Sequence, residues 1–175
     1  VRKEITVLFT DINGFTPICE KHEPEEVISM LSGYFSKMVD VIMKYDGYLK
    51  QYVGDEIVVI FGAPDDRDDH ATRAVLTALE MRDVLRQAKL EAGAKPGFFD
   101  IKAGINTGEV VVGKVGPESR WEYAAVGDSV NLGARVMSTA QKLGADIGVS
   151  EATRQRFEKE RLATSPVPTT QVEWT

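Results

Sequence analysis

The stretch Glu4 to Thr16, EITVLFTDINGFT, decides the fold of this chain. Its nearly continuous run of β-branched and aromatic residues predicts a central strand that is buried on both faces. Gly14 then permits a tight bend, so the strand delivers Asp11 beside a turn. A buried carboxylate needs a cation, backbone N–H groups or a basic side chain to compensate its charge. This stretch therefore predicts both a core strand and a site.

A second stretch, Tyr48 to Gly62 (YLKQYVGDEIVVIFG), predicts a β-hairpin, because two strand-like halves meet at Gly54-Asp55. Asp55 therefore stands at a strand end, as Asp11 does. Two hard oxygen ligands beside a Gly-containing turn with free backbone amides suit a divalent metal, expected to be Mg²⁺, and substrate phosphate oxygens. The alternative is that both aspartates only serve turns, since Asp and Gly are the commonest turn residues.

Length and composition indicate a single domain over residues 1–175, because 43% of the 175 residues are hydrophobic and can bury one sizeable core. A net charge of −6 and the lack of a Lys/Arg run argue against a nucleic-acid partner. The single cysteine, Cys19, excludes an intrachain disulfide. The sequence has no apolar run of about 18 residues and no recognisable signal peptide. We expect a cytoplasmic domain cut from a larger protein, because the chain begins almost inside its first strand.

The remaining sequence alternates helical and strand-like patterns. Apolar residues recur at helical spacing from Val27 to Ile42, after acidic residues at Glu23 to Glu26 that favour a helix start. Further elements are expected in this order: a helix over His70 to Leu90, strands over Asp100 to Asn106 and Glu109 to Val115 joined at Thr107-Gly108, a helix over Asp128 to Leu143, a strand over Asp146 to Ser150, and a helix over Glu151 to Arg161 that Ser150 caps. This order predicts an α/β (α+β) domain of the ferredoxin-like βαββαβ kind, with a mixed sheet covered mainly by helices on one face.

Two polar features are interpreted as structural. The charged loop Asp65 to Asp69 is expected to be a solvated turn rather than a second metal site. His70 is expected to be a polar residue at a helix start, because no second histidine or cysteine lies near it in sequence to complete a site.

Five separated motifs resemble the class III nucleotide cyclases, whose catalytic domains make cyclic AMP or cyclic GMP. In chain order they are Phe9-Thr10-Asp11-Ile12-Asn13-Gly14-Phe15-Thr16, Val53-Gly54-Asp55-Glu56, Asp69-His70-Ala71-Thr72-Arg73-Ala74, Gly104-Ile105-Asn106-Thr107-Gly108, and Val126-Gly127-Asp128-Ser129-Val130-Asn131-Leu132-Gly133-Ala134-Arg135. Diguanylate cyclases share the general architecture and a Gly-Asp-Glu motif, but the later motifs favour class III. The resemblance extends over most of the chain. It implies an adenylyl cyclase, a lyase that forms 3′,5′-cyclic AMP from ATP, fused in a signalling protein to an upstream sensor or membrane region.

The resemblance also implies which residues bind the metal and the substrate. Asp11, Ile12 and Asp55 would hold two divalent ions, Mg²⁺ or Mn²⁺. The residues expected to bind the nucleotide are Gly14, Phe15, Thr16, Gln51, Ala124 and Arg120. In this family the metal-binding residues of one subunit meet a second group of residues from its partner, which implies a head-to-tail homodimer with composite sites.

That second group corresponds to Asn131 and Arg135, which match the family's transition-state pair. The two residues stand four apart, so their side chains lie on one face of the expected helix. An amide and a guanidinium on one face suit an anionic oxygen whose charge grows during a reaction.

Two positions expected to select the base depart from the family pattern. Gln51 stands where adenylyl cyclases usually have lysine and guanylyl cyclases glutamate. Ala124 stands where adenylyl cyclases usually have aspartate or threonine, and guanylyl cyclases cysteine or another small polar residue. Because a glutamine amide pairs with either purine, we expect ATP to be preferred over GTP by no more than about a hundredfold. Lys50 would contact adenine only after a register change that turns the strand over, which we do not expect.

The end of the chain departs from the family as well. Family members usually continue into strands with a Val-Lys-Gly motif whose lysine contacts the triphosphate. Residues 162–175 contain no lysine and predict an irregular tail with one short strand at Gln171 to Trp174. In the family, an arm that crosses to the partner subunit has a basic position, and Arg120 matches it. Arg120 would then contact a β or γ phosphate; the alternative is an ordinary surface arginine. Two alternatives stay open, a guanylyl or mixed purine cyclase and a catalytically silent dimeric nucleotide-sensing module.

Overall fold

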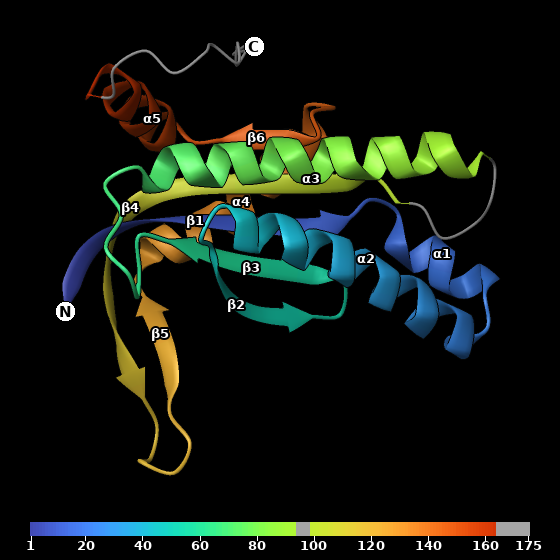
Figure 1. Ribbon diagram of the computed structural model, residues 1–175, viewed down its shortest axis with the longest axis horizontal. Helices are drawn as coiled ribbons and strands as arrows, with labels where there is room; N and C mark the ends of the chain where they lie inside the picture. The colour runs from blue at the N-terminus through green and yellow to red at the C-terminus, as the bar shows by residue number, and fades with distance from the viewer. Residues whose placement is uncertain (94–98, 164–175) are drawn as a thin grey trace.

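The computed structural model describes residues 1–93 and 99–163, and Figure 1 shows how their helices and strands are arranged. Along the chain the elements are β1 (Arg2–Ile12), α1 (Phe15–Lys21), α2 (Pro24–Lys44), β2 (Tyr48–Val53), β3 (Glu56–Phe61), α3 (His70–Ala92), β4 (Ile101–Val115), β5 (Glu122–Val126), α4 (Asp128–Lys142), β6 (Ile147–Val149) and α5 (Glu151–Ala163). The order contains the expected βαββαβ core, with α1 and α2 together in the place of its first helix.

The described strands form one mixed sheet. Neighbouring strands follow the order β2-β3-β1-β4-β5 and are antiparallel, whereas β6 pairs with β4 in parallel. β1 lies at the centre and pairs with β4 along its whole length, from Arg2 to Ile12. The predicted ferredoxin-like α+β fold is confirmed.

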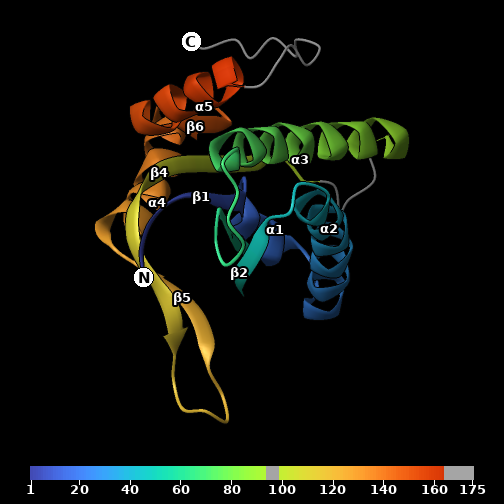
Figure 2. The same cartoon turned by 60° about the vertical axis from the view of Figure 1, so that its left-hand side comes forward.

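Both faces of β1 are buried, as its sequence predicts. Leu8 and Ile12 pack into a cluster with α2 and α3, while Ile5, Val7 and Phe9 pack into a second cluster that includes residues of α4. Figures 1 and 2 show α2 and α3 on one side of the sheet and α4 on the other. Helices therefore cover β1 from both sides, although the side facing α2 and α3 carries the larger cluster.

β4 differs from the prediction of two strands joined by a turn at Thr107-Gly108. Ile101 to Val115 is one continuous strand, and Thr107 and Gly108 pair with Thr6 and Ile5 inside the β1–β4 ladder. Gly108 serves close packing instead of a turn, because a Cβ at this position would lie 2.4 Å from Ser129 Oγ of α4. Pairing with the long strand β1 overrides the local turn signal.

The end of β4 and the whole of β5 form a two-stranded arm, which Figures 1 and 2 show projecting away from the rest of the domain. Val115 pairs with Glu122, so β4 and β5 continue as a hairpin beyond the main body of the sheet. Lys114 Nζ lies 4.0 Å from the centre of the Trp121 ring, a cation–π contact that joins the two sides of the arm.

The helix predictions are confirmed apart from one omission. Ser150 Oγ accepts a hydrogen bond from the Thr153 N–H at 3.2 Å, as expected of the residue that caps α5. α1 was not predicted, and its 7 residues include none that is buried, so no apolar periodicity marks it. Leu162 and Ala163, which were expected in the irregular tail, belong to α5 instead. The strand expected at Gln171 to Trp174 lies outside the described residues.

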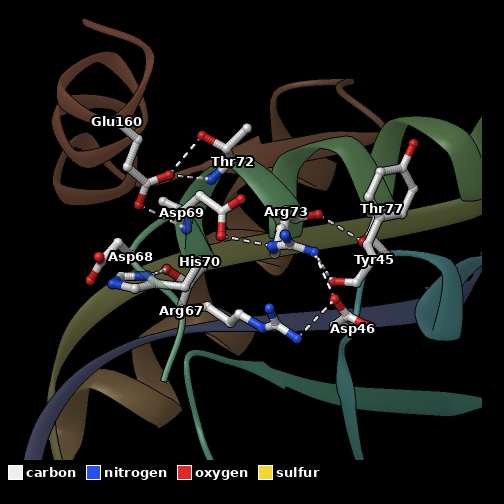
Figure 3. Close-up of polar contacts among 12 residues, drawn as sticks. Tyr45, Asp46, Arg67, Asp68, Asp69, His70, Thr72, Arg73, Thr77 and Glu160 are labelled. Carbon is white, nitrogen blue, oxygen red and sulfur yellow. Dashed lines mark hydrogen bonds and ion pairs between the residues drawn. The ribbon is translucent and has the colours of Figure 1, made fainter. Parts of the chain in front are cut away.

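A polar network holds the start of α3, as Figure 3 shows. Glu160 of α5 accepts hydrogen bonds from the Ala71 N–H (3.1 Å), the Thr72 N–H (2.7 Å) and the Thr72 hydroxyl (2.6 Å). A helix start leaves backbone N–H groups without partners inside the helix, and a carboxylate is favoured there by the helix dipole. Glu160 therefore ties α5 to α3.

His70 and the loop before it also serve the fold, as expected. His70 is buried, its Nδ1 lies 2.8 Å from Thr6 Oγ1, and burial lowers its pKa. In the same network Arg67 pairs with Asp46 at 3.2 Å. Among residues 1–93 and 99–163, no helix has the length and apolar character needed to cross a membrane.

Candidate active site

Asp11 and Asp55 meet at a single backbone N–H. Asp11 lies next to the end of β1, and Asp55 lies in the turn between β2 and β3. The Ile12 N–H lies 3.1 Å from Asp11 Oδ1 and 2.9 Å from Asp55 Oδ2. The fold thus brings together the two carboxylates that the sequence placed at strand ends, and Ile12 orients them through its backbone.

The negative charge at this point is not fully compensated by the protein. Burial, followed by the adjacent Asp55 side chain, raises the pKa of Asp11 to about 7. Burial and the charge of Asp55 also raise the pKa of Glu56. The electrostatics of the site therefore favour the binding of a cation beside Asp11 and Asp55.

Lys102 is a member of this site that sequence reasoning missed. It stands opposite Asp11 in the β1–β4 ladder, and its Nζ lies 3.5 Å from Asp11 Oδ2. Its charge lowers the pKa of Asp11, but burial and Asp55 have the larger effect. A lysine inside the apolar run Ile101 to Ile105 was a visible signal, yet only the strand register shows which carboxylate it faces.

The turn after the carboxylates contains three residues expected to bind substrate. Gly14 has a φ of 69°, in the left-handed region that favours glycine, and precedes the first turn of α1. Phe15 packs against the cluster beneath α2 and α3, and Thr16 is exposed. Their contact with a nucleotide stays a prediction, and Phe15 has a packing role as well.

Asn131 and Arg135 lie one turn apart on the exposed side of α4, while Met137 and Ala140 of the same helix are buried. In the described part of the chain, neither polar side chain makes a hydrogen bond or an ion pair, and none joins them to Asp11 or Asp55. The sequence correctly placed both on one helix face. Among the described residues of one chain, these two side chains have no polar partner.

Gln51 is exposed on β2, next to a β-bulge. Leu49 pairs with Val59 and Gln51 pairs with Val58, so Lys50 is an extra residue without a partner on β3. The register shift is thus local, because a bulge absorbs one residue without turning the whole strand over. That Lys50 does not contact adenine stays a prediction.

Ala124 and Arg120 both belong to the arm. Ala124 pairs with Gly113 in the β4–β5 ladder and is half-buried. Arg120 is exposed in the turn of the arm, where its backbone N–H donates to the Pro117 carbonyl at 2.9 Å. No hydrogen bond or ion pair of these two side chains to the carboxylates occurs in residues 1–93 and 99–163, so their roles stay predictions.

The residues around Asp11 and Asp55 fit divalent metal ions that are bound together with phosphate. No group of three or more His, Cys, Asp or Glu side chains that could hold a metal occurs in the described part of the chain. Mg²⁺ is typically held by one or two carboxylates, with water and substrate phosphate oxygens as its other ligands. Two like charges crowded at one N–H, with the pKa of Asp11 raised, are the electrostatic situation that a cation relieves.

Comparison with known proteins then identifies the family. The sequence model of the adenylate and guanylate cyclase catalytic domain matches residues 2–173. This chain belongs to that family, the class III nucleotide cyclase catalytic domains, and the resemblance of its five motifs is confirmed.

The relatives include both kinds of cyclase. Adenylate cyclase 1 of Rhizobium meliloti (strain 1021) is 38% identical over 154 residues, which are 86% of this chain and 23% of that protein. The crystal structure of the guanylyl cyclase Cya2 superposes with a TM-score of 0.78 at 40% identity and covers 90% of this chain and 79% of that chain. The adenylyl cyclase CyaB from P. aeruginosa superposes with a TM-score of 0.79 at 33% identity and covers 91% of this chain and 82% of that chain. This chain therefore spans under a quarter of the length of the Rhizobium meliloti relative.

Proposed function

We propose that this chain is an adenylyl cyclase domain that converts ATP to 3′,5′-cyclic AMP and pyrophosphate. The observation that carries the proposal is the convergence of Asp11 and Asp55 on the Ile12 N–H, in a chain of the cyclase family. Burial and the like charge of Asp55 raise the pKa of Asp11, which is the condition expected of a site that receives metal ions with a triphosphate.

In the proposed reaction, Asp11 and Asp55 would hold two divalent ions, with the main chain at Ile12 as a further member of the site. Mg²⁺ or Mn²⁺, when bound, neutralises the triphosphate and lowers the pKa of the ribose 3′-hydroxyl. The 3′-oxygen attacks the α-phosphorus in line, its proton passes to water, and the bond to pyrophosphate breaks. Arg135 stabilises the charge that develops on the α-phosphate, and Asn131 orients the ribose.

Two copies of the chain would complete each site. Asp11 and Asp55 would come from one protomer, and Asn131 and Arg135 from its partner. Large apolar side chains are exposed on the arm and on α4, which supports their burial against a second copy. These side chains include Val115 (59% exposed), Val126 (64%) and Leu132 (40%).

A longer parent protein is part of the proposal. Because the matched region is 23% of the Rhizobium meliloti relative, we expect this domain to be joined to a sensor or membrane region that controls it in signal transduction. The domain itself would then act in the cytoplasm, where ATP is available.

A guanylyl or mixed purine cyclase is the second candidate. The 40% identity to the guanylyl cyclase Cya2 favours it. A catalytically silent nucleotide-sensing module is the third, and the presence of Asp11, Asp55, Asn131 and Arg135 together counts against it.

The deciding experiment measures the cyclic nucleotide and pyrophosphate formed from ATP and from GTP under matched conditions, with Mg²⁺ and with Mn²⁺. We expect kcat/KM to be higher for ATP than for GTP, with cyclic AMP as the main product. A variant with both Asp11→Asn and Asp55→Asn is the control for contaminating activity. Cyclic GMP as the main product would select the second candidate, and no cyclic product from either triphosphate would refute catalysis.

A further inference from the structure

We propose that Asn106 is a positioning residue, which fixes the start of α4 so that Asn131 and Arg135 of the same helix are aimed at the substrate. The inference rests on the proposed function and deepens it, because it identifies what orients the two side chains that would act on the ribose and the α-phosphate. Asn106 belongs to the motif Gly104 to Gly108, which resembles the cyclase family but has no part in the proposed reaction so far.

One polar side chain on β4 holds the helix. Gly104, Asn106 and Gly108 are alternate residues of this strand, so they share the face of the sheet that α4 covers. Asn106 is only 2% exposed, and its Nδ2 donates a hydrogen bond to the Ser129 carbonyl at 2.8 Å. Ser129 is the second residue of α4, so this bond holds the helix at its first turn.

The glycine before Asn106 on the same face brings α4 close to the strand. A Cβ at Gly104 would lie 2.3 Å from the Met137 backbone nitrogen and 2.4 Å from the Gly133 carbonyl oxygen. Both atoms belong to the helix backbone, so a side chain at Gly104 would force α4 away from β4. The strand therefore contacts the helix closely from Ser129 to Met137, and Asn106 supplies the directional contact within this stretch.

Stability alone does not explain an asparagine at this position. Its Oδ1 is buried and has no hydrogen-bond partner among the described residues, and a buried acceptor without a partner destabilises the folded state. Turning the amide over would not help, because Oδ1 would then face the Ser129 carbonyl oxygen. The amide thus leaves one of its atoms unpaired while the other holds α4.

Asn131 and Arg135 depend on the helix for their placement. Both are exposed, and neither side chain has a polar partner in residues 1–93 and 99–163. The backbone of α4 therefore decides where these side chains point. Donors that stabilise a transition state must be held in place before the reaction, and a small displacement lowers the rate strongly. A helix fixed by Asn106 supplies this preorganisation.

The first test separates kcat from KM for ATP. Asn106→Ala should lower kcat by about tenfold or more and change KM by less than about threefold, because Arg135 acts on charge that develops in the transition state. Thr107→Val is the matched control, because this neighbouring residue faces the other side of the sheet, where its hydroxyl lies 2.7 Å from Thr6 Oγ1 and 3.0 Å from Thr153 Oγ1. The control also loses a buried polar group, but it should keep the kcat of the wild type. An unchanged kcat in Asn106→Ala, or an equal loss in the control, would overturn the proposal.

Mixed dimers of differently tagged chains show which part of the site Asn106 serves. In a heterodimer of Asn106→Ala with Asp11→Asn, one site combines the carboxylates of the first chain with the intact α4 of the second, so about half of the wild-type activity should return. In a heterodimer of Asn106→Ala with Arg135→Ala, each site contains an altered α4, so the activity should not exceed that of Asn106→Ala. The reverse pattern would assign Asn106 to the carboxylates of its own chain, and equal activities would indicate a general effect on the fold. Either result would overturn the proposal.

Hydrogen exchange tests the inference without catalysis. In the chain without nucleotide, backbone amides over residues 129–135 should exchange about tenfold faster in Asn106→Ala than in the wild type, while those of α3 keep their rates. Thr107→Val should leave residues 129–135 unchanged. Thermal unfolding checks that each variant is folded, and Asn106→Ser, whose side chain is too short to contact the Ser129 carbonyl, replaces Asn106→Ala if the latter is not.

The exchange measurement also separates this inference from the proposed function. If the wild type forms no cyclic nucleotide, the proposed function fails, and the exchange rates still decide whether Asn106 fixes the start of α4. Equal exchange over residues 129–135 in the Asn106 variant and the wild type would overturn the inference, whatever the activity.

Discussion

The start of α3 and the end of β1 are both rich in charged and polar groups, but only the first is satisfied by the protein itself. At α3, the Glu160 carboxylate accepts hydrogen bonds from both the backbone and the hydroxyl of Thr72 (Figure 3). At the end of β1, Asp11 and Asp55 share the Ile12 N–H, and burial with the like charge raises the pKa of Asp11 to about 7. The difference separates a cluster that holds the fold from one that we propose binds metal ions and substrate.

Two arginines show the same difference between a side chain with protein partners and one without them in the described part of the chain. Arg73 donates to Asp69 at 2.7 Å and to Asp46 at 3.0 Å, and the hydrogen bond to Asp69, ahead of other causes, raises its pKa. Arg135 makes no such contact in the described part of the chain. A guanidinium without a partner on an exposed helix face is available to a substrate or to a second chain.

The largest effect is expected when a carboxylate of the unsatisfied cluster loses its charge. Asp55→Asn keeps the shape of the side chain but removes a charged oxygen ligand, so cyclase activity should fall by about a hundredfold or more at saturating Mg²⁺. Asp65→Asn, in the exposed loop before α3, is the matched control and should keep full activity. Near-normal activity of Asp55→Asn would refute the proposed metal site.

The satisfied cluster should respond in stability instead of activity. Glu160→Ala leaves the N–H groups of Ala71 and Thr72 without their acceptor, so the free energy of unfolding should fall by about 2–3 kcal/mol. Urea unfolding measures this loss. Glu158→Ala, which removes only an exposed pair with Arg154, is the control and should cost less than about 0.5 kcal/mol. An equal loss in both variants would mean that Glu160 does not hold α3.

A smaller effect of opposite sign is expected for Asp11→Asn in EDTA. The folded-state pKa of about 7 lies above the ordinary value of 3.8, so between these pH values the folded state binds a proton that the unfolded state does not. Wild-type stability therefore falls as the pH rises through this range. After allowance for solvent screening, the free energy of unfolding of Asp11→Asn should exceed that of the wild type by about 1 kcal/mol above pH 7. Near pH 4 the two should be equal.

Thermal unfolding with and without Mg²⁺ compares the wild type with Asp11→Asn by a second measurement. Mg²⁺ should raise the Tm of the wild type more than that of Asp11→Asn, because a ligand of the folded state stabilises it by mass action. A pH-independent change in the stability of the variant would show that charge crowding at Asp11 has no part in it.

The parts of the fold and site that local sequence chemistry determines were predictable. Asp11 and Asp55 each follow a strand pattern beside a glycine, and Asn131 and Arg135 share a helix face because four residues make about one turn. Asp11 and Asp55 meet at one N–H only because β3 pairs with β1. The hairpin and strand patterns in the sequence are compatible with this pairing but do not specify it.

The parts that depend on distant pairing were not predictable. Thr107-Gly108 has the composition of a turn, yet β1 pairs across it and Ser129 needs the space beside Gly108. Lys102 faces Asp11 only because of the β1–β4 register. The bulge at Lys50 likewise has no composition signal, because Lys50 is one of several polar residues on an edge strand. Each of these features is decided by a partner strand or helix far away in the sequence.

The central claim is that two chains complete each active site, and mixing two inactive variants tests it most directly. A heterodimer of Asp11→Asn with Arg135→Ala contains one site with all four residues intact and one site with two defects. Random mixing should therefore restore roughly a quarter of the wild-type activity per chain. Activity in the mixture, with none in either variant alone, is the result we predict. A heterodimer verified by differently tagged chains that remains inactive would contradict the account.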